Sequence, residues 1–183
     1  MTETELSFLY FLHQFTGNAF ADSTVLFLTK LGNMGAVWVV LGLGLACFRR
    51  TRLLGFTVLL AAFFSTLLGN GFLKPLIDRP RPCEIVSGIN FLIPCPGDGS
   101  FPSGHTFAGV AAATVFWLTR APGRGLVLIL AALIALTRLY LFVHFPSDIL
   151  GGIVFGILCG WAAVKTVGAL RERLGLPDHP WQR

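Results

Sequence analysis

Charged residues are scarce in this sequence, and their scarcity excludes an ordinary water-soluble domain. The chain has 183 residues, of which 13% are charged and 54% are hydrophobic. Its mean hydropathy is +0.73. A soluble domain carries about a quarter charged residues. Because so few charges cannot cover a surface that faces water, much of the chain is expected to face lipid. The length fits one membrane-embedded domain over residues 1–183.

Several other signatures are missing. The N-terminal sequence MTETELSFLYFLHQF lacks the basic start and the small-residue cleavage site of a signal peptide, so the first spanning segment is expected to direct insertion. The four cysteines lack metal-ligand spacing, and we predict no metal and no cofactor. The formal charge of +5 comes from basic residues at the ends of apolar runs rather than along one polar face. No nucleic-acid partner is therefore predicted.

Long apolar runs dominate what is present. A transmembrane helix needs roughly 17–25 mostly apolar residues. The clearest run, 53–73, carries no charge. Further spans are expected at 35–48 with a preceding turn, 103–119, 125–143 and 146–164. The predicted fold class is an all-α, multi-pass transmembrane helical bundle of about five to six spans.

The N-terminal segment 1–30 differs from these runs. Its broad apolar face is broken by His13 and Gln14, and the sequence TGN at 16–18 indicates a break. We predict an amphipathic helix in the membrane interface, with a short sixth span as the alternative.

Lysine and arginine placement predicts the orientation. With five spans, one side of the membrane receives Arg49, Arg50, Arg52, Arg120, Arg124, Lys165, Arg171, Arg173 and Arg183. An excess of basic residues marks the cytoplasmic side, so the C-terminus is expected there. The irregular 75–102 loop and the 144–148 turn then face outward. In that oxidising environment Cys83 and Cys95 either form a disulfide or remain two thiols.

Three polar clusters fall on the predicted outward face, within residues 74–82, 101–106 and 137–148. Each alone has a structural explanation, because basic residues snorkel, serine caps helices and an acid complements a helix dipole. Arg138 is different, since it lies inside an apolar run where an unpaired charge costs at least about 2.5–3.5 kcal/mol.

Together the clusters predict a phosphate site. Lys74, Arg81 and Arg138 supply three cations, of which the arginines can bind phosphate oxygens in pairs. Ser103 and Gly104 stand at an expected helix N-terminus, which favours phosphate.

Two histidines and an acid add chemistry to this site. Asp148 follows His144 by four residues, a spacing that lets the carboxylate hold the tautomer in which the other ring nitrogen is nucleophilic. His105 is a second group for proton transfer. These residues predict phosphoryl transfer.

The three motifs resemble the signature of the type 2 phosphatidic acid phosphatase superfamily, K-x6-RP, PSGH and SR-x5-H-x3-D. The matches are Lys74 to Arg81-Pro82, the segment 102–105, and Arg138, His144 and Asp148 with both spacings intact. Thr137 stands where serine is usual.

The resemblance implies metal-independent hydrolysis of a phosphate ester or diphosphate through a phosphohistidine. His144 would be the nucleophile, Asp148 its orienting partner and His105 the acid for the leaving group. The phosphoryl group would be bound by Lys74, Arg81, Ser103, Gly104 and Arg138. Arg79 lies outside the strict pattern. Three roles are open for it: binding a second phosphate, binding a lipid headgroup, or only anchoring the loop.

Short bacterial undecaprenyl-diphosphate phosphatases of this superfamily are similar, with a brief N-terminal helix before the same core. The resemblance therefore favours conversion of undecaprenyl diphosphate to undecaprenyl phosphate at the outer face of the cell membrane, as in recycling of this carrier during wall synthesis. Phosphatidylglycerophosphate, phosphatidate and lipid A 1-phosphate are alternative substrates. A non-catalytic lipid or anion transporter and a structural subunit are alternatives of other classes, but neither explains His105 or the spacing from His144 to Asp148.

Overall fold

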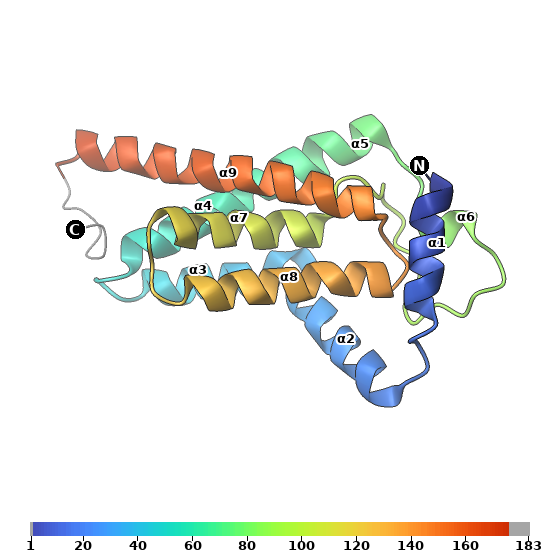
Figure 1. The fold of residues 1–183 in the computed structure, drawn as a ribbon. Coiled ribbons are helices and arrows are strands. Elements are labelled where there is room, and N and C mark those ends of the chain that lie inside the picture. Colours follow the sequence, from blue (N-terminus) through green and yellow to red (C-terminus); the bar gives the residue numbers. More distant parts are fainter. Residues whose placement is uncertain (1, 176–183) are drawn as a thin grey trace.

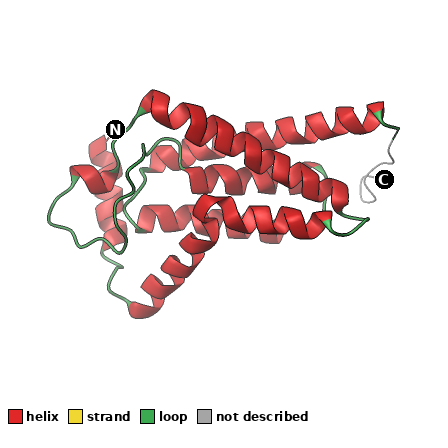
Figure 2. Cartoon of the chain, turned by 180° about the vertical axis from the view of Figure 1, so that it is seen from behind, coloured by secondary structure: helices red, strands yellow, loops and turns green. Residues whose placement is uncertain are grey.

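The protein is described here by a computed structural model covering residues 2–175 (Figure 1). Arg183, which the orientation prediction includes, lies outside the described residues. Every regular element within 2–175 is a helix, so the predicted all-α class is confirmed (Figure 2).

Five helices lie side by side along the molecule. They are α3 (Ala36–Ala46), α4 (Arg52–Leu68), α7 (Gly104–Leu118), α8 (Arg124–Tyr140) and α9 (Pro146–Arg173). Helix α7 is central, since it packs against the other four (Figure 1). The short helices α5 (Lys74–Ile77) and α6 (Pro82–Ile85) lie in the connection from α4 to α7.

Two N-terminal helices flank this bundle. Helix α1 (Thr2–His13) lies across one end of it, and α2 (Ala19–Gly32) runs obliquely from α1 toward α3 (Figure 1). The turn between them contains the predicted break at 16–18, and the Asn18 side chain caps α2 by accepting from the backbone N–H groups of Phe20 and Ala21.

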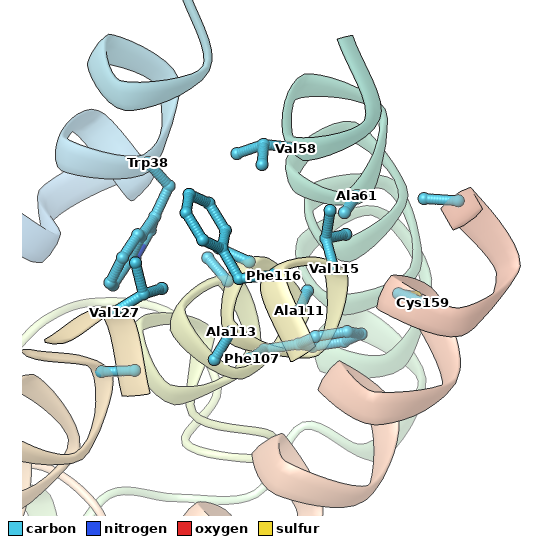
Figure 3. Close-up of a cluster of buried hydrophobic side chains, with 14 of the residues drawn as sticks. Trp38, Val58, Ala61, Phe107, Ala111, Ala113, Val115, Phe116, Val127 and Cys159 are labelled. Atoms are coloured by element: carbon cyan, nitrogen blue, oxygen red, sulfur yellow. The ribbon is translucent and has the colours of Figure 1, made fainter. Parts of the chain in front are cut away.

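Aromatic and small side chains share the core. Trp38, Val115 and Phe116 are buried where α3, α4, α7 and α8 meet, and Phe107 packs near Phe155 of α9 (Figure 3). On the opposite side of α7, small residues let α9 approach closely. A Cβ added at Gly160 would lie 2.6 Å from the carbonyl oxygen of Ala111, so the two backbones could not approach so closely if a larger residue stood there.

Within residues 2–175, three helical stretches are long and apolar enough to cross a membrane: Ala19–Ala46, Arg52–Ile85 and Pro146–Arg173. Helix Gly104–Leu118 is apolar but shorter. Large apolar side chains are exposed on the outside of the bundle, among them Phe56, Phe63, Leu126, Leu150 and Val154. In water this exposure would be unfavourable, whereas in lipid it is expected.

The boundaries depart from the sequence expectations in two places. Helix α9 continues past residue 164 to Arg173, because no proline interrupts the stretch and residues 169–173 are good helix formers. The run 53–73 was expected to form one span, but α4 ends at Leu68 and a π-helical turn, Gly69–Leu73, follows it. The turn expected before the 35–48 span is present as a kink at residues 33–35, in which Met34 has φ 52°.

The two ends of the bundle differ. The turns 47–51 and 119–123 lie at the end where α9 finishes, whereas α1 and the long 78–103 connection lie at the other (Figure 1). A Cys83–Cys95 disulfide, with Cα atoms 5.9 Å apart, closes part of that connection. Of the two expected states of these cysteines, the structure has the disulfide.

Candidate active site

The three predicted polar clusters converge at the end of the bundle that carries α1. A cavity of about 870 Å³ is lined by six of the predicted residues, namely Lys74, Arg81, Gly104, His105, Arg138 and His144. Ser103 and Asp148 are buried behind its wall. Residues that lie 74 positions apart in the sequence are brought together because α4, α7, α8 and α9 all begin or end here.

The three cations are all buried, and their partners differ. Lys74 Nζ donates to Asp98, and Arg81 Nη2 donates to Oδ1 of the same carboxylate at 2.7 Å. Arg138 Nη1 donates to the Thr29 hydroxyl, but its Nε has no hydrogen-bond partner within the described chain. A buried N–H without a partner is costly, so Arg138 is suited to receive an oxygen of a ligand.

Asp98 was missed by the motif analysis. Its side chain is 54% exposed, yet it accepts hydrogen bonds from two of the three cations. Burial opposes its ionisation, but hydrogen bonds and positive charge from Lys74 and Arg81 lower the pKa of Asp98 to about 2. The carboxylate therefore occupies donors that a phosphate would use. The only sequence signal for Asp98 was its position in the loop between the first and second motifs.

His144 has one ring nitrogen suited to nucleophilic attack. Its Nε2 lies 3.2 Å from Arg81 Nη1. Because a guanidinium can only donate, Nε2 is the acceptor and carries no proton. Burial and the charges of Arg81 and Arg138 lower the pKa of His144 to about 4, against the opposing effect of Asp148. The ring is therefore neutral at pH 7.

The proton of neutral His144 is on Nδ1, which faces Asp148 Oδ2 at 3.5 Å. That distance is longer than an ordinary N–H···O hydrogen bond, and Nδ1 has no other partner among the described residues. The carboxylate itself is firmly held, since Oδ2 accepts from the Phe145 N–H at 2.8 Å. Asp148 lies where it can orient the imidazole and face the charge of a protonated or phosphorylated ring.

Ser103 and Gly104 open α7 as predicted, but Ser103 does not cap it. The buried Ser103 hydroxyl accepts from Thr106 Oγ1 at 3.1 Å, and its N–H donates to the Asp148 carbonyl at 3.1 Å. Without a side-chain cap, the first N–H groups of α7 are left for an anion at the cavity. The explanation of Ser103 as a simple helix cap is wrong.

His105 is oriented by the N-terminal part of the chain. Its Nε2 lies 3.2 Å from the Thr29 carbonyl oxygen and 3.1 Å from Asn33 Oδ1. A carbonyl only accepts, so Nε2 carries a proton. A Cβ added at Gly32 would lie 2.5 Å from His105 Cδ2. No motif marks Thr29, Gly32 or Asn33, so sequence analysis missed these contacts.

Arg79 does not line the cavity. Its Nη1 donates to Asp148 Oδ1 at 2.6 Å and to the Ser147 hydroxyl at 2.7 Å. Its Nη2 donates to Glu5 at 3.1 Å. Arg79 thus binds Asp148 and Glu5 rather than lining the cavity with the other cations. Within residues 2–175, no group of three His, Cys, Asp or Glu side chains is arranged to hold a metal ion.

A family model described as the PAP2 superfamily matches residues 50–172. The chain belongs to the PAP2 superfamily. This is the type 2 phosphatidic acid phosphatase superfamily that the motifs resemble, and the matched range contains all three of them. The apolar helices of this PAP2 chain, together with its membership, make it a membrane protein.

Relatives of the PAP2 chain carry several names. An undecaprenyl-diphosphatase of Sulfolobus acidocaldarius is 29% identical over 158 residues, which are 86% of this chain and 76% of the relative. A decaprenylphosphoryl-5-phosphoribose phosphatase of Mycobacterium tuberculosis is 38% identical over 101 residues, 55% of this chain and 54% of that protein. The chain therefore spans about half the length of the second relative.

A solved structure is also similar. The crystal structure of Aquifex aeolicus LpxE superposes with a TM-score of 0.73 at 29% identity, covering 87% of this chain and 94% of that one. The helical arrangement of the PAP2 chain therefore matches a known fold over most of its length.

Proposed function

We propose that this PAP2 protein is an integral membrane phosphatase that hydrolyses a lipid phosphate or diphosphate through a phosphohistidine intermediate. The observation that carries the proposal is His144, whose unprotonated Nε2 lines the same cavity as Lys74, Arg81 and Arg138. A nucleophile among three cations is suited to attack on phosphorus.

The chemistry proceeds in two steps. On substrate binding, Arg81 Nη1 shifts its hydrogen bond from His144 Nε2 to a phosphate oxygen, and His105 takes up a second proton as the negative charge of the substrate offsets the nearby cations. The freed Nε2 lone pair forms a bond to phosphorus while the bond from phosphorus to the leaving oxygen breaks, and His105 gives that oxygen its proton. Water then attacks phosphorus and gives a proton to His105, the bond to His144 breaks, and inorganic phosphate leaves. Asp148 stabilises the charge that His144 carries between the steps. These steps use no metal and no cofactor.

The favoured substrate is undecaprenyl diphosphate, which would be converted to undecaprenyl phosphate. Support comes from the Sulfolobus acidocaldarius relative of that name, which aligns with 86% of this chain. Other relatives are named phosphatidylglycerophosphatase and lipid A 1-phosphatase. Phosphatidylglycerophosphate, lipid A 1-phosphate and phosphatidate are therefore the competing substrates.

We place the site at the extracytoplasmic face and the C-terminus in the cytoplasm. The basic turns 47–51 and 119–123 lie at the end of the bundle opposite the cavity (Figure 1). In this arrangement α3, α4, α7, α8 and α9 cross the bilayer, and α1 lies in the interface because it runs across the bundle end.

The test is release of inorganic phosphate by the purified protein in detergent with a chelator present. We expect turnover of undecaprenyl diphosphate to exceed that of the other three lipids, and we expect His144→Ala to abolish turnover of all four. Full turnover by His144→Ala would refute the assignment of the nucleophile. Binding of the lipid without any phosphate release would instead favour a non-catalytic transporter.

A further inference from the structure

Arg79 belongs to none of the three motif matches, yet it holds the most buried acid of the site. The Asp148 side chain is fully buried, and its Oδ1 lies 2.6 Å from Arg79 Nη1. The guanidinium also lies over the Phe145 ring, 4.1 Å from its centroid. Arg79 is therefore fixed behind Asp148 and does not line the cavity.

Glu5 holds Arg79 from the other side. The Glu5 side chain is 12% exposed, and its Oε2 accepts from Arg79 Nη2 at 3.1 Å. Its Oε1 accepts from the Ser147 N–H at 2.9 Å, so α1 is joined to the first turn of α9. Burial opposes ionisation, but the hydrogen bonds from Ser147 and the charge of Arg79 lower the pKa of Glu5.

The result is a row of alternating charges that leads to the nucleophile. Glu5 faces Arg79, Arg79 faces Asp148, and Asp148 faces His144 Nδ1. A carboxylate that already binds a guanidinium acts less strongly on a neighbouring imidazole, because part of its charge is compensated. Glu5 in turn compensates part of the charge of Arg79.

We infer that Glu5 and Arg79 are positioning residues for the nucleophile, holding the Asp148 carboxylate and setting how strongly it acts on His144. Helix α1 is then part of the active centre rather than only a membrane anchor. This inference rests on the proposed function, since it gives His144 the nucleophilic role.

The test compares Glu5→Gln, Arg79→Gln and the double variant in the purified full-length protein. Because Glu5 acts through Arg79, the double variant should be no less active than Arg79→Gln alone. Each single variant is expected to lower kcat by about tenfold and change KM by less than about threefold. Two matched controls, Glu3→Gln on the exposed side of α1 and Arg49→Gln at the other end, should leave both constants unchanged.

The pH at which kcat/KM falls on the acidic side distinguishes a positioning role of Glu5 and Arg79 from a purely structural one. The charged and titratable groups around His144 are Arg81, Arg138, Asp148 and, in α7, His105. None of them changes in the variants. Arg79→Gln frees the charge of Asp148 and should move the limb to higher pH, whereas Glu5→Gln should move it to lower pH.

Three results would overturn the inference. If the acidic limb of kcat/KM stays at the same pH in both variants, Glu5 and Arg79 only support the structure. A raised KM with unchanged kcat for Arg79→Gln would make Arg79 a substrate-binding residue. Effects of the two substitutions that multiply in the double variant would show that Glu5 does not act through Arg79.

If Arg79→Gln fails to fold, Arg79→Lys and Glu5→Gln carry the test. Lysine keeps the charge but cannot bridge two carboxylates as a guanidinium does, so it should lower kcat without moving the limb to higher pH. Active His144→Ala protein would sink the proposed function. If His144→Ala is inactive while the Glu5 and Arg79 variants keep the kcat and the acidic limb of the unmodified protein, only this inference is wrong.

Discussion

Single side chains set the charge of the site. Lys74, Arg81 and Arg138 are buried together, and Asp98 contacts two of them. Their charge exceeds that of Asp98, so the cavity favours an anion. An arriving phosphate has to compete with Asp98 for the donors of Lys74 and Arg81.

Asp98→Asn is therefore predicted to tighten the binding of inorganic phosphate, because the competing charge is removed. The inhibition constant should fall by about tenfold, which corresponds to about 1.4 kcal/mol. Phosphate inhibition of lipid turnover measures it. Asp78→Asn, an exposed acid of the same connection, is the matched control and should change nothing. Weaker inhibition by phosphate in Asp98→Asn would mean that Asp98 mainly holds the two cations in place.

The pH dependence of the free enzyme follows from His144. Its pKa is lowered to about 4, so Nε2 stays unprotonated down to that pH and is lost as a nucleophile below it. We expect kcat/KM to stay level on this account from pH 7 to about 5 and to fall as pH passes through about 4. Measuring the pH profile of kcat/KM for a monoester and for a diphosphate separates ionisation of His144 from ionisation of the substrate. An acidic limb caused by the substrate shifts in pH between the two substrates, whereas a limb caused by His144 does not. A fixed limb near pH 6.5 would contradict the burial argument.

Helices α7 and α9 carry the two halves of the site, so their packing matters for function. Gly160→Ala would place a Cβ 2.6 Å from the backbone oxygen of Ala111. We expect it to destabilise the fold by about 1–3 kcal/mol, the usual cost of overpacking. Gly168→Ala on the same helix meets nothing within 4 Å and should instead be neutral or stabilising. Thermal unfolding in detergent compares them, and equal unfolding temperatures would mean that α7 and α9 adjust easily.

Elements were predictable from sequence where one signal dominated. Apolar runs marked the bundle helices, and the motif residues marked the cavity, because charge inside an apolar run has few uses. The link between α1 and the site was not predictable, since Glu5 lies 74 residues before Arg79 and neither spacing nor periodicity relates them. The contacts of His105 with α2 were hidden for the same reason.

The molecule as a whole has two unlike ends, and this predicts which positions face which side. In a Cys47→Ala background, Gln14→Cys, between α1 and α2, should react with a membrane-impermeant maleimide in intact cells. Arg49→Cys, at the other end, should react only after permeabilisation. Both positions are exposed, so burial does not explain a difference. The reverse pattern would place the site in the cytoplasm.

Transfer of the phosphoryl group to His144 is the central step of the proposed mechanism. The most direct measurement is trapping of the phosphorylated protein during turnover of a labelled lipid diphosphate, followed by localisation of the label. The leaving group of a lipid diphosphate is itself a phosphate ester and needs little help from an acid, so His105→Ala should slow hydrolysis of the phosphohistidine more than its formation. In that variant we expect acid-labile phosphate on His144, and none in His144→Ala. Continued release of inorganic phosphate with no label on His144, or label on another residue, would contradict the account.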